Sequence, residues 1–479
     1  MLVIGGNQSS GGFEVANSLL LDRASGAKIT NTFGSTTNRR TYTVSLWTKK
    51  TNVSQEQNLV FAGDLSGANP FFDFRFNSDQ TVNWYQSDNS GSGAEFNLIT
   101  NRKFTDPNSW YHIVMAVDTT QGTSSNRVKL YINGVQQTSF STETYPSQNF
   151  DTSFNAANYE SQYGALRTST PTYDGYICEV VLIDGQQLDP TSFGEFDSDS
   201  GVWRAIDVSG LTFGTNGYYL DFEDSSDLGQ DVSGNNNDFT LTNIAATDQY
   251  TDTCTNNYPI MNILENARAG ATFSEGNLKV VSTNSNRAWN MASFGLSQGK
   301  WYWEVKYVAS GGSTPSDGWN HIGISDRAPD SSTDILGESD YQYSVFEADG
   351  KIYASSSSGT TYGSSFSTGA IINIALDLDN YNCYWGVNGQ WGNGSGSWNQ
   401  SSPSSAISIE DIPGTLNDLY FPAFGDGGVN VAKTWEANFG NPPFSISSGN
   451  SDANGYGNFE YAVPSGYYTI NTKNLAEFG

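Results

Sequence analysis

Apolar side chains alternate with polar or small ones along much of the chain, and this period of two limits the fold more than any other feature. Tyr42, Val44 and Leu46 alternate in this way, and so do the apolar residues of the segment 371–378. Successive side chains of a β-strand point to opposite faces, so the pattern predicts strands with one buried face. No comparable helical period stands out, and the sequence therefore predicts an all-β protein.

Two Asn-Gly dipeptides lie between alternating segments, at Asn133-Gly134 and at Asn388-Gly389. Both residue types tolerate positive φ, so an Asn-Gly pair between two strands is the strongest short-range signal for a β-hairpin. Charged residues make up only 15% of the chain, and Gly accounts for 50 residues. This composition favours short strands joined by tight turns, and we expect antiparallel sandwiches or barrels.

A chain of 479 residues suits two or three domains, and the strand patterns fall into two blocks. We therefore predict two antiparallel β-sandwich (jelly-roll) domains in tandem, joined by an irregular connector. The predicted parts are an N-terminal arm that could anchor the chain (1–12), a first sandwich (13–200), a connector with short strands (201–268), a second sandwich (269–445) and a C-terminal tail (446–479).

The formal charge is −28, from 22 Lys and Arg and 50 Asp and Glu. Such a chain repels phosphate backbones, so we expect no nucleic-acid partner. No run approaches the roughly 20 apolar residues of a membrane span, so we expect no membrane insertion. The first residues lack the pattern of a signal peptide, and we expect synthesis in a cytoplasm without a standard export signal.

Three cysteines are present: Cys178, Cys254 and Cys383. Their odd number and wide spacing argue against a disulfide framework and against a zinc site rich in cysteine. Cys178 and Cys383 lie inside apolar strand patterns, so we expect both to be buried as small apolar side chains.

The N-terminal block resembles the laminin-G-like, concanavalin-type jelly rolls. The matching pieces, in order over about residues 13–200, are RRTYTVSLWTKK, NSWYHIVMAVDTT, NRVKLYINGVQ and DGYICEVVLIDGQQL. The second block, over about residues 270–445, resembles a SPRY domain. Its pieces are GKWYWEVKY, HIGISD, GKIYA, INIALDLDNYNCYWGVNGQW, LYFPAFGDG and EANFGNPPF.

The whole arrangement is similar to a class of marine-phage particle proteins. In that class, segments like GTNGYYLDFEDSSDLGQDVSGNNNDFT and PSGYYTINTKNLAEFG accompany a jelly roll and a SPRY-like module. The resemblance implies a virion structural protein of the fibre or adhesin kind. The chain departs from a long fibre, because it has no heptad stretch and no fibrous repeat.

Concanavalin-type sandwiches also include glycanases, which use a pair of carboxylates. Glu179 is the tempting residue, and its neighbours suggest a regular strand position. The jelly-roll resemblance implies that a glutamate here belongs to the fold's signature. His112 and His321 lie in different blocks without a nucleophile motif beside them, and we expect both to be structural. We therefore expect no enzyme activity, and a polysaccharide depolymerase is the alternative.

One loop carries oxygen side chains at alternate positions, as calcium loops do. The candidate ligands are Asp231, Ser233, Asn235, Asn237 and Asp238. The loop departs from the helix-loop-helix calcium pattern at Asn236 and Thr242, and turns rich in Asn and Asp have the same composition without metal. Calcium is the only cofactor that the sequence suggests. Jelly-roll lectins often hold calcium at loop tips, which leaves Asp64, Asp73 and Asp174 open as well.

A sugar ring has an apolar C–H face and a rim of hydroxyls, so an aromatic platform with a few amides suffices to bind it. The candidate ligand-binding residues are Trp84, Tyr85, Trp319, Trp391, Asn393, Trp398 and Asn399. Packing in a sandwich core is the alternative for each tryptophan, because aromatic side chains dominate such cores.

We expect a virion surface protein, a fibre, adhesin or decoration protein, that binds host-surface carbohydrate or another envelope component. Modest affinity at each site predicts many copies, and so a homo-oligomer or array. The alternative is a structural head or tail protein whose domains bind only other virion proteins.

Overall fold

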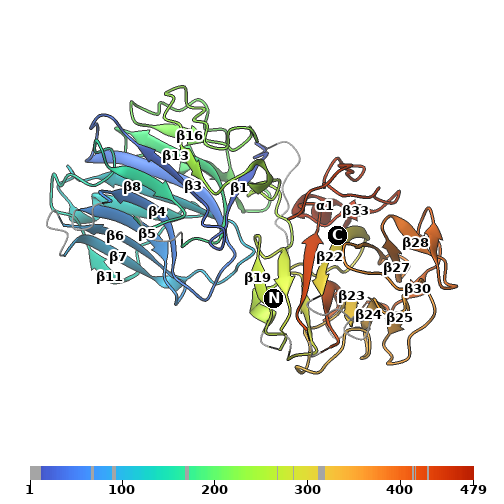
Figure 1. Ribbon diagram of the computed structural model, residues 1–479. Helices are drawn as coiled ribbons and strands as arrows, with labels where there is room; N and C mark the ends of the chain where they lie inside the picture. The colour runs from blue at the N-terminus through green and yellow to red at the C-terminus, as the bar shows by residue number, and fades with distance from the viewer. Residues whose placement is uncertain are drawn as a thin grey trace. The chain divides into compact units, whose positions relative to one another are not determined.

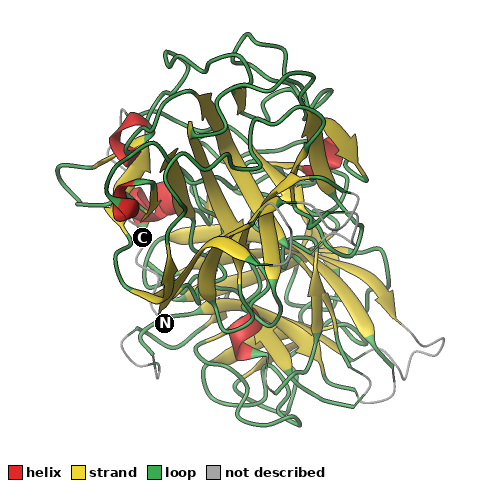
Figure 2. Ribbon diagram, turned by 90° about the vertical axis from the view of Figure 1, so that its left-hand side faces the viewer, coloured by secondary structure: helices red, strands yellow, loops and turns green. Residues whose placement is uncertain are grey.

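The computed structural model describes residues 12–65, 70–88, 93–167, 172–266, 268–283, 285–310, 319–412, 415, 417–428 and 431–479. The chain divides into two compact units, which we call the N-terminal unit (Gln8–Asn256) and the C-terminal unit (Asn257–Gly479). Strands and loops make up nearly all of the described chain, and helical segments are few and short (Figure 2). The all-β prediction is confirmed.

Two sheets of eight strands form the N-terminal unit. The first contains, in spatial order, β10 (Val135–Gln136), β9 (Val128–Ile132), β8 (Tyr111–Asp118), β3 (Thr41–Lys50), β13 (Gly175–Asp184), β1 (Ser18–Leu21) and β18 (Gln249–Tyr250), with β16 (Tyr218–Leu220) also paired to β13. The second contains β11 (Phe140–Thr144), β7 (Ala94–Lys103), β6 (Thr81–Ser87), β5 (Phe71–Phe76), β4 (Gln57–Gly63), β12 (Glu160–Tyr163), β2 (Lys28–Thr32) and β17 (Thr240–Thr242).

The two sheets of this unit pack face to face, as the layers in Figure 1 show. Tyr42, Val44 and Leu46 of β3 share one buried cluster with Phe72 and Phe74 of β5. The alternation in the sequence is what puts these side chains on the inner face of each sheet. A short extra pair, β14 (Gly194–Phe196) and β15 (Trp203–Ala205), forms outside the two sheets.

The C-terminal unit has a ten-stranded and a five-stranded sheet. The larger contains β19 (Thr272–Ser274), β20 (Lys279–Val281), β32 (Lys433–Asn438), β22 (Lys300–Ser310), β26 (Ile371–Asp377), β27 (Asn382–Val387), β28 (Gln390–Gly392) and β29 (Trp398–Gln400), with β30 (Ile407–Ser408) on β27 and β33 (Tyr468–Thr469) on β22. The smaller contains β21 (Trp289–Met291), β31 (Phe421–Asp426), β23 (Asn320–Ser325), β24 (Gln342–Phe346) and β25 (Ile352–Ala354).

Buried aromatic side chains join these two sheets into a second sandwich. The Trp385 indole of β27 donates to the Ile322 carbonyl of β23 at 3.0 Å. Phe424 of β31 lies 5.6 Å from Trp435 of β32, measured between ring centroids. The helical segments are η1 (Ser124–Asn126), η2 (Pro190–Ser192), η3 (Ala246–Asp248), η4 (Ile263–Glu265) and α1 (Thr472–Phe478).

Both predicted hairpins form. Asn133 and Gly134 have φ of 49° and 75° and connect β9 to β10, with Val135 paired to Ile132. Asn388 and Gly389 have φ of 51° and 75° and connect β27 to β28. The left-handed conformation of both residues is the one that a tight turn between twisted strands needs.

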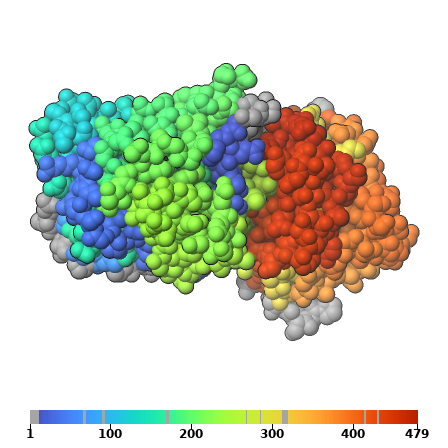
Figure 3. Space-filling model, turned by 90° about the horizontal axis from the view of Figure 1, so that it is seen from above, coloured from blue at the N-terminus to red at the C-terminus, as the bar shows by residue number. Residues whose placement is uncertain are grey.

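The predicted connector, 201–268, is not a separate element. The chain divides at Asn256, and three short strands before that point complete the N-terminal sandwich. β16 pairs with β13, β17 with β2 and β18 with β1. The surface of this unit is accordingly covered in part by residues that follow position 190, drawn in light green in Figure 3. Each of these strands has only two or three residues, which is too short for an alternating pattern to identify it, although the three residues of β16 are all buried.

The segment 446–479 is likewise not a free tail. β33 pairs in parallel with β22, and Phe459 and Tyr467 join a buried cluster on the larger sheet. Asn471 caps α1 by accepting from the Asn474 amide at 2.9 Å. The segment therefore covers part of the outer face of this sheet, and it forms a continuous red surface in Figure 3.

Candidate functional site

Trp84 of β6, predicted as a stacking platform, is a core residue. Its side chain is 0% exposed, and its ring meets Phe96 edge to face at a centroid distance of 5.2 Å. The inward face of β6 carries this position, so the ring is not available to a ligand. Tyr85, on the opposite face, is partly exposed, and its hydroxyl donates to the Gly93 carbonyl at 3.0 Å.

Trp391 of β28 is also buried, with 4% of its side chain exposed. It packs with Tyr302, Phe459 and Tyr467 on the larger sheet of the C-terminal unit. The C-terminal segment provides two of these three neighbours. The expectation of an open ring at Trp391 is therefore wrong, because a segment far along the chain covers it.

Trp398 and Trp319 are the two predicted tryptophans that stay partly exposed. Trp319 has 40% of its side chain exposed, and its ring lies 5.6 Å from that of Phe346. Trp398 of β29 lines a pocket of about 500 Å³, which we call the Trp398 pocket.

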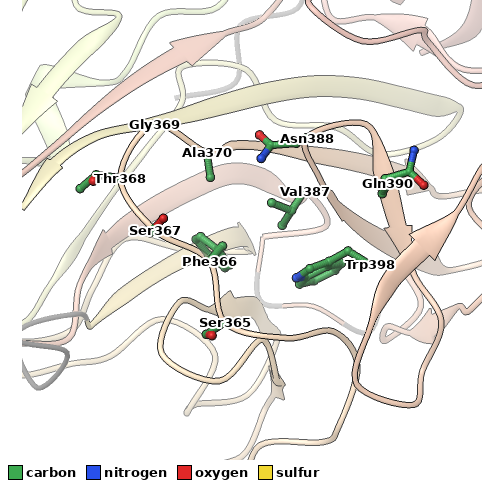
Figure 4. Close-up of a pocket in the computed structure, with 10 residues that line it drawn as sticks. All are labelled: Ser365, Phe366, Ser367, Thr368, Gly369, Ala370, Val387, Asn388, Gln390 and Trp398. Carbon is green, nitrogen blue, oxygen red and sulfur yellow. The ribbon is translucent and has the colours of Figure 1, made fainter.

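Ten residues line the Trp398 pocket, and none of them carries a charge. They are Ser365, Phe366, Ser367, Thr368, Gly369, Ala370, Val387, Asn388, Gln390 and Trp398. Figure 4 shows the rings of Trp398 and Phe366 on either side of the Val387 side chain, with Asn388 and Gln390 above them in the view. The pocket thus combines two aromatic rings with amides and hydroxyls.

Local hydrogen bonds hold the Trp398 ring in place. Its Nε1 donates to the Ser364 carbonyl at 2.7 Å, and the ring crosses the backbone at Gly363. A Cβ at position 363 would lie 2.2 Å from the ring, so only glycine permits this approach. Tyr362 supports the ring from one side at a centroid distance of 5.9 Å.

The Asn388-Gly389 turn positions the other wall of the pocket. The backbone N–H of Asn388 donates to the Ile371 carbonyl at 2.8 Å, and the side-chain Oδ1 of Asn388 accepts from the backbone N–H of Ile371 at 2.9 Å. Asn388 therefore has a structural role, and its Nδ2 remains as a donor at the pocket. Gln390 is exposed, and the bond from its Nε2 to the Gly389 carbonyl is long at 3.4 Å.

The other predicted amides serve the neighbouring turn. The Asn393 Oδ1 accepts from the N–H groups of Ser395 and Ser397 at 2.8 and 3.1 Å. Asn399 is exposed and accepts from the Gln400 side chain at 2.9 Å. Neither lines the pocket. Phe366 and Gln390 were not predicted as site residues, although an aromatic residue inside the Ser-rich run 364–368 was a usable signal.

The candidate calcium loop is held by its own hydrogen bonds. Asp231 is buried, and its carboxylate accepts from the N–H groups of Tyr219, Ser233 and Asn237 and from the Ser233 hydroxyl, all at 2.8 or 2.9 Å. The Asp238 carboxylate accepts from the Asp231 N–H at 2.9 Å. These bonds form a turn network rich in Asn and Asp, which is the arrangement that the sequence offered as the alternative to a calcium site. Across the described ranges, no three His, Cys, Asp or Glu side chains are grouped to hold a metal ion.

The loop-tip aspartates show no common site. Asp73 lies inside β5, where it is buried and bonds to Asn58 and Arg75. Burial raises the pKa of Asp73 to about 6. Asp174 accepts from the Arg23 N–H at 2.8 Å and from the Asn52 amide at 3.0 Å.

Glu179 lies in a β-bulge of β13, not in a regular strand position. Its φ is 50°, and the register shifts between Cys178 and Val181. The bulge turns the side chain into a buried position where its Oε2 accepts from the Tyr219 hydroxyl at 2.8 Å. Burial raises the pKa of Glu179 to about 8.

Both histidines are buried in their sandwiches, as expected of structural residues. The Trp203 indole donates to the His112 Nδ1 at 2.9 Å, which places the ring proton on Nε2 beside the Ser45 hydroxyl. His321 bonds to the Ser344 hydroxyl at 3.0 Å. Burial lowers the pKa of each imidazole to about 3, so both are neutral at ordinary pH.

Cys178 and Cys383 are buried as expected. The fold places the Cys178 and Cys254 sulfurs 3.8 Å apart, a proximity that their spacing of 76 residues did not suggest. No helix in the described ranges has the length and apolar character of a membrane span.

Comparisons with known proteins found a matching family model, related proteins and similar solved structures. Residues 22–188 match the Laminin_G_3 family model, the concanavalin A-like lectin/glucanases superfamily. Ran-binding protein 9 of Homo sapiens is 30% identical over 146 residues, which are 30% of this chain and 17% of that protein. Ran-binding protein 10 of Danio rerio is 29% identical over 146 residues, which are 30% of this chain and 20% of that protein. The chain thus spans about a fifth of the length of these relatives.

Among solved structures, the SPRY domain of human HERC1 is 16% identical with a TM-score of 0.26, over 35% of this chain and 91% of that one. Domain 4 of the arabinanase AbnA from Geobacillus stearothermophilus, in complex with arabinotriose, is 22% identical with a TM-score of 0.24. The match covers 33% of this chain and 66% of that one. The resemblance to phage-particle proteins stays a prediction. Residues 22–188 carry a concanavalin A-like, laminin-G jelly roll, and the chain is also similar to SPRY domains.

Proposed function

We propose that this protein binds a neutral carbohydrate in the Trp398 pocket. The observation that carries the proposal is a partly exposed indole that shares a pocket of about 500 Å³ with Phe366 and uncharged amides and hydroxyls. Small-molecule sites of this kind are concave and combine apolar walls with a few placed polar groups.

The chemistry of the lining suits a sugar ring. The Trp398 ring offers a flat apolar face to the ring C–H groups, and its N–H is already bonded to Ser364. Gln390 and Asn388 supply amides, and Ser365, Ser367 and Thr368 supply hydroxyls that can donate and accept. The ten lining residues include no carboxylate, which supports binding over acid-base hydrolysis of a glycosidic bond.

The proposal extends to a place on a virion surface, where the ligand would be a host-surface glycan. The jelly roll, the SPRY-like module and the two segments that accompany them in phage-particle proteins support this extension. A shallow single site binds weakly, so copies of the chain arranged on one particle would supply avidity. The formal charge of −28 gives no attraction to an anionic envelope, which makes stacking and hydrogen bonding the expected source of affinity.

The test is binding of the purified chain to an array of neutral glycans and to intact bacterial cells. We expect W398A to weaken glycan binding by about five-fold to thirty-fold, because an aromatic platform contributes on the order of 1–2 kcal/mol. W398F should retain part of the binding, since it keeps an aromatic face. W319A is the matched control, because Trp319 is also partly exposed in the same unit and lies outside the pocket.

Loss of binding in W319A with full binding in W398A would contradict the assignment to this pocket. Failure of the folded wild-type chain to bind any neutral glycan would contradict carbohydrate binding itself. Release of reducing sugar would identify a depolymerase instead. Circular dichroism of each variant shows whether the fold is intact.

A further inference from the structure

A second pocket, of about 470 Å³, lies in the N-terminal unit. Three chain segments line it, and we call it the asparagine pocket: residues 31–35, residues 215–216 and residues 235–238. It includes Asn31, Asn216, Asn235, Asn236, Asn237 and Asp238. Gly34, Thr215 and Asn235 are exposed, so the pocket is open to solvent.

The asparagines that line this pocket donate their amide hydrogens to backbone carbonyls. The Asn235 Nδ2 donates to the carbonyls of Gly214 and Gly217 at 2.6 and 2.9 Å. The Asn237 Nδ2 donates to the carbonyls of Thr215 and Gly217 at 3.1 and 2.9 Å. A carbonyl only accepts, so these contacts fix which end of each amide is nitrogen.

Asn31 and Asn216 follow the same rule. The Asn31 Nδ2 donates to the carbonyls of Asn237 and Asp238 at 3.1 and 2.7 Å. The Asn216 Nδ2 donates to the Ser35 carbonyl at 3.0 Å. The hydrogen-bonding group that remains on each amide is its oxygen. The Asn31 Oδ1 has no partner among the described residues, but it is shielded from solvent and is not one of the acceptors offered to a ligand.

The pocket is therefore rich in acceptors, and its one ionisable lining side chain, Asp238, is negatively charged. Amide and carboxylate oxygens accept hydrogen bonds, so the pocket favours a ligand that brings donors. A protonated primary amine has three N–H donors and no acceptor, whereas a hydroxyl brings one donor and its own lone pairs. A metal ion is a poorer occupant, because calcium needs six to eight oxygens at roughly 2.3–2.6 Å and this pocket is far wider.

We propose that the asparagine pocket binds the protonated amine of an amino sugar. The volume exceeds that of an ammonium ion, and the lining also includes Thr32, Ser35 and Thr215, whose hydroxyls can donate to and accept from ring hydroxyls. The amine meets the amide oxygens and the Asp238 carboxylate. This proposal does not depend on the Trp398 pocket, which lies in the other unit.

The test is titration of the full chain with glucosamine, N-acetylglucosamine and glucose, followed by calorimetry or ligand-observed NMR. We expect glucosamine to bind at least about five-fold more tightly than either neutral sugar, because acetylation and replacement by hydroxyl both remove the ammonium. D238N should weaken glucosamine binding by about five-fold and leave the fold intact, since an asparagine Oδ1 can still accept from the Asp231 N–H. The titrations are repeated in W398A, which removes the contribution of the Trp398 pocket to sugar binding, and the preference for glucosamine should persist in that variant.

The matched control is D207N, which removes an equally exposed carboxylate that also accepts one backbone N–H, from Ser209 at 2.9 Å. Equal affinity for glucosamine and glucose would overturn the proposal, and so would equal losses in D238N and D207N. Tight binding of calcium that displaces glucosamine would show an ion site instead. Equal affinity for the ε-amine of N-acetyl-lysine methylamide would overturn the sugar as the source of the amine.

Discussion

The two pockets use asparagine in opposite ways. In the Trp398 pocket, the Asn388 oxygen is bonded to the Ile371 N–H and its NH₂ group remains as a donor. In the asparagine pocket, the NH₂ groups of Asn235 and Asn237 are bonded to carbonyls and the oxygens remain. The backbone groups that each turn leaves unsatisfied decide which end of an amide faces the ligand. Residue type alone does not predict ligand chemistry.

The largest expected effect separates the buried tryptophan from the pocket tryptophan, seven residues apart. W391A should lower the free energy of unfolding of the C-terminal unit by about 3–5 kcal/mol, because it empties a core position beside Tyr302 and Phe459. W398A should cost less than about 2 kcal/mol, because its ring is only partly buried. Urea unfolding followed by circular dichroism measures both. Equal losses would show that the Trp398 ring is a core element, which would break the distinction between the two positions.

An effect of intermediate size is expected in the pH dependence of stability, which should change in E179Q while ligand binding does not. The folded pKa of Glu179, about 8, lies above the 4.5 of the free side chain. Its contribution to stability is therefore complete below about pH 4.5 and is lost as the pH rises to about 8. E179Q should flatten the pH dependence of the thermal midpoint of the N-terminal unit between those values.

E179Q should leave ligand binding in both pockets unchanged at every pH, since Glu179 lines neither of them. E304Q provides the same comparison for the pH dependence of stability in the C-terminal unit. Glu304 accepts from Tyr302 and from the N–H groups of Glu460 and Tyr461, and burial raises its pKa only to about 7. A pH profile unaltered in E179Q would contradict a neutral Glu179.

The smallest expected effect is the loss of glycan affinity when one amide is removed from the Trp398 pocket. Q390A should weaken glycan binding by about three-fold to ten-fold, the value of one neutral hydrogen bond. Q400A is its control, because Gln400 lies on the neighbouring strand and does not line the pocket. A larger loss in Q400A than in Q390A would place the glycan on the other side of β29.

Several features could be predicted from the sequence because they are local. The alternation around Tyr42 and at 371–378 predicts strands with one buried face, and the two Asn-Gly pairs predict hairpins that the structure contains. Ordered segments also predicted a jelly roll and a SPRY-like domain. These features depend on backbone conformation and side-chain period, which neighbouring residues set.

Only the tertiary structure decided which aromatic side chains remain open. Trp391 and Trp398 occur in the same Gly-rich and Ser-rich context, yet Phe459 and Tyr467 cover the first, while Gly363 and Phe366 place the second in a pocket. The bulge at Glu179 and the edge strands after residue 201 were hidden for the same reason. An alternating pattern shows that a strand has a buried face. The element that covers this face comes from a distant part of the chain, and its position depends on tertiary packing, which a local pattern does not predict.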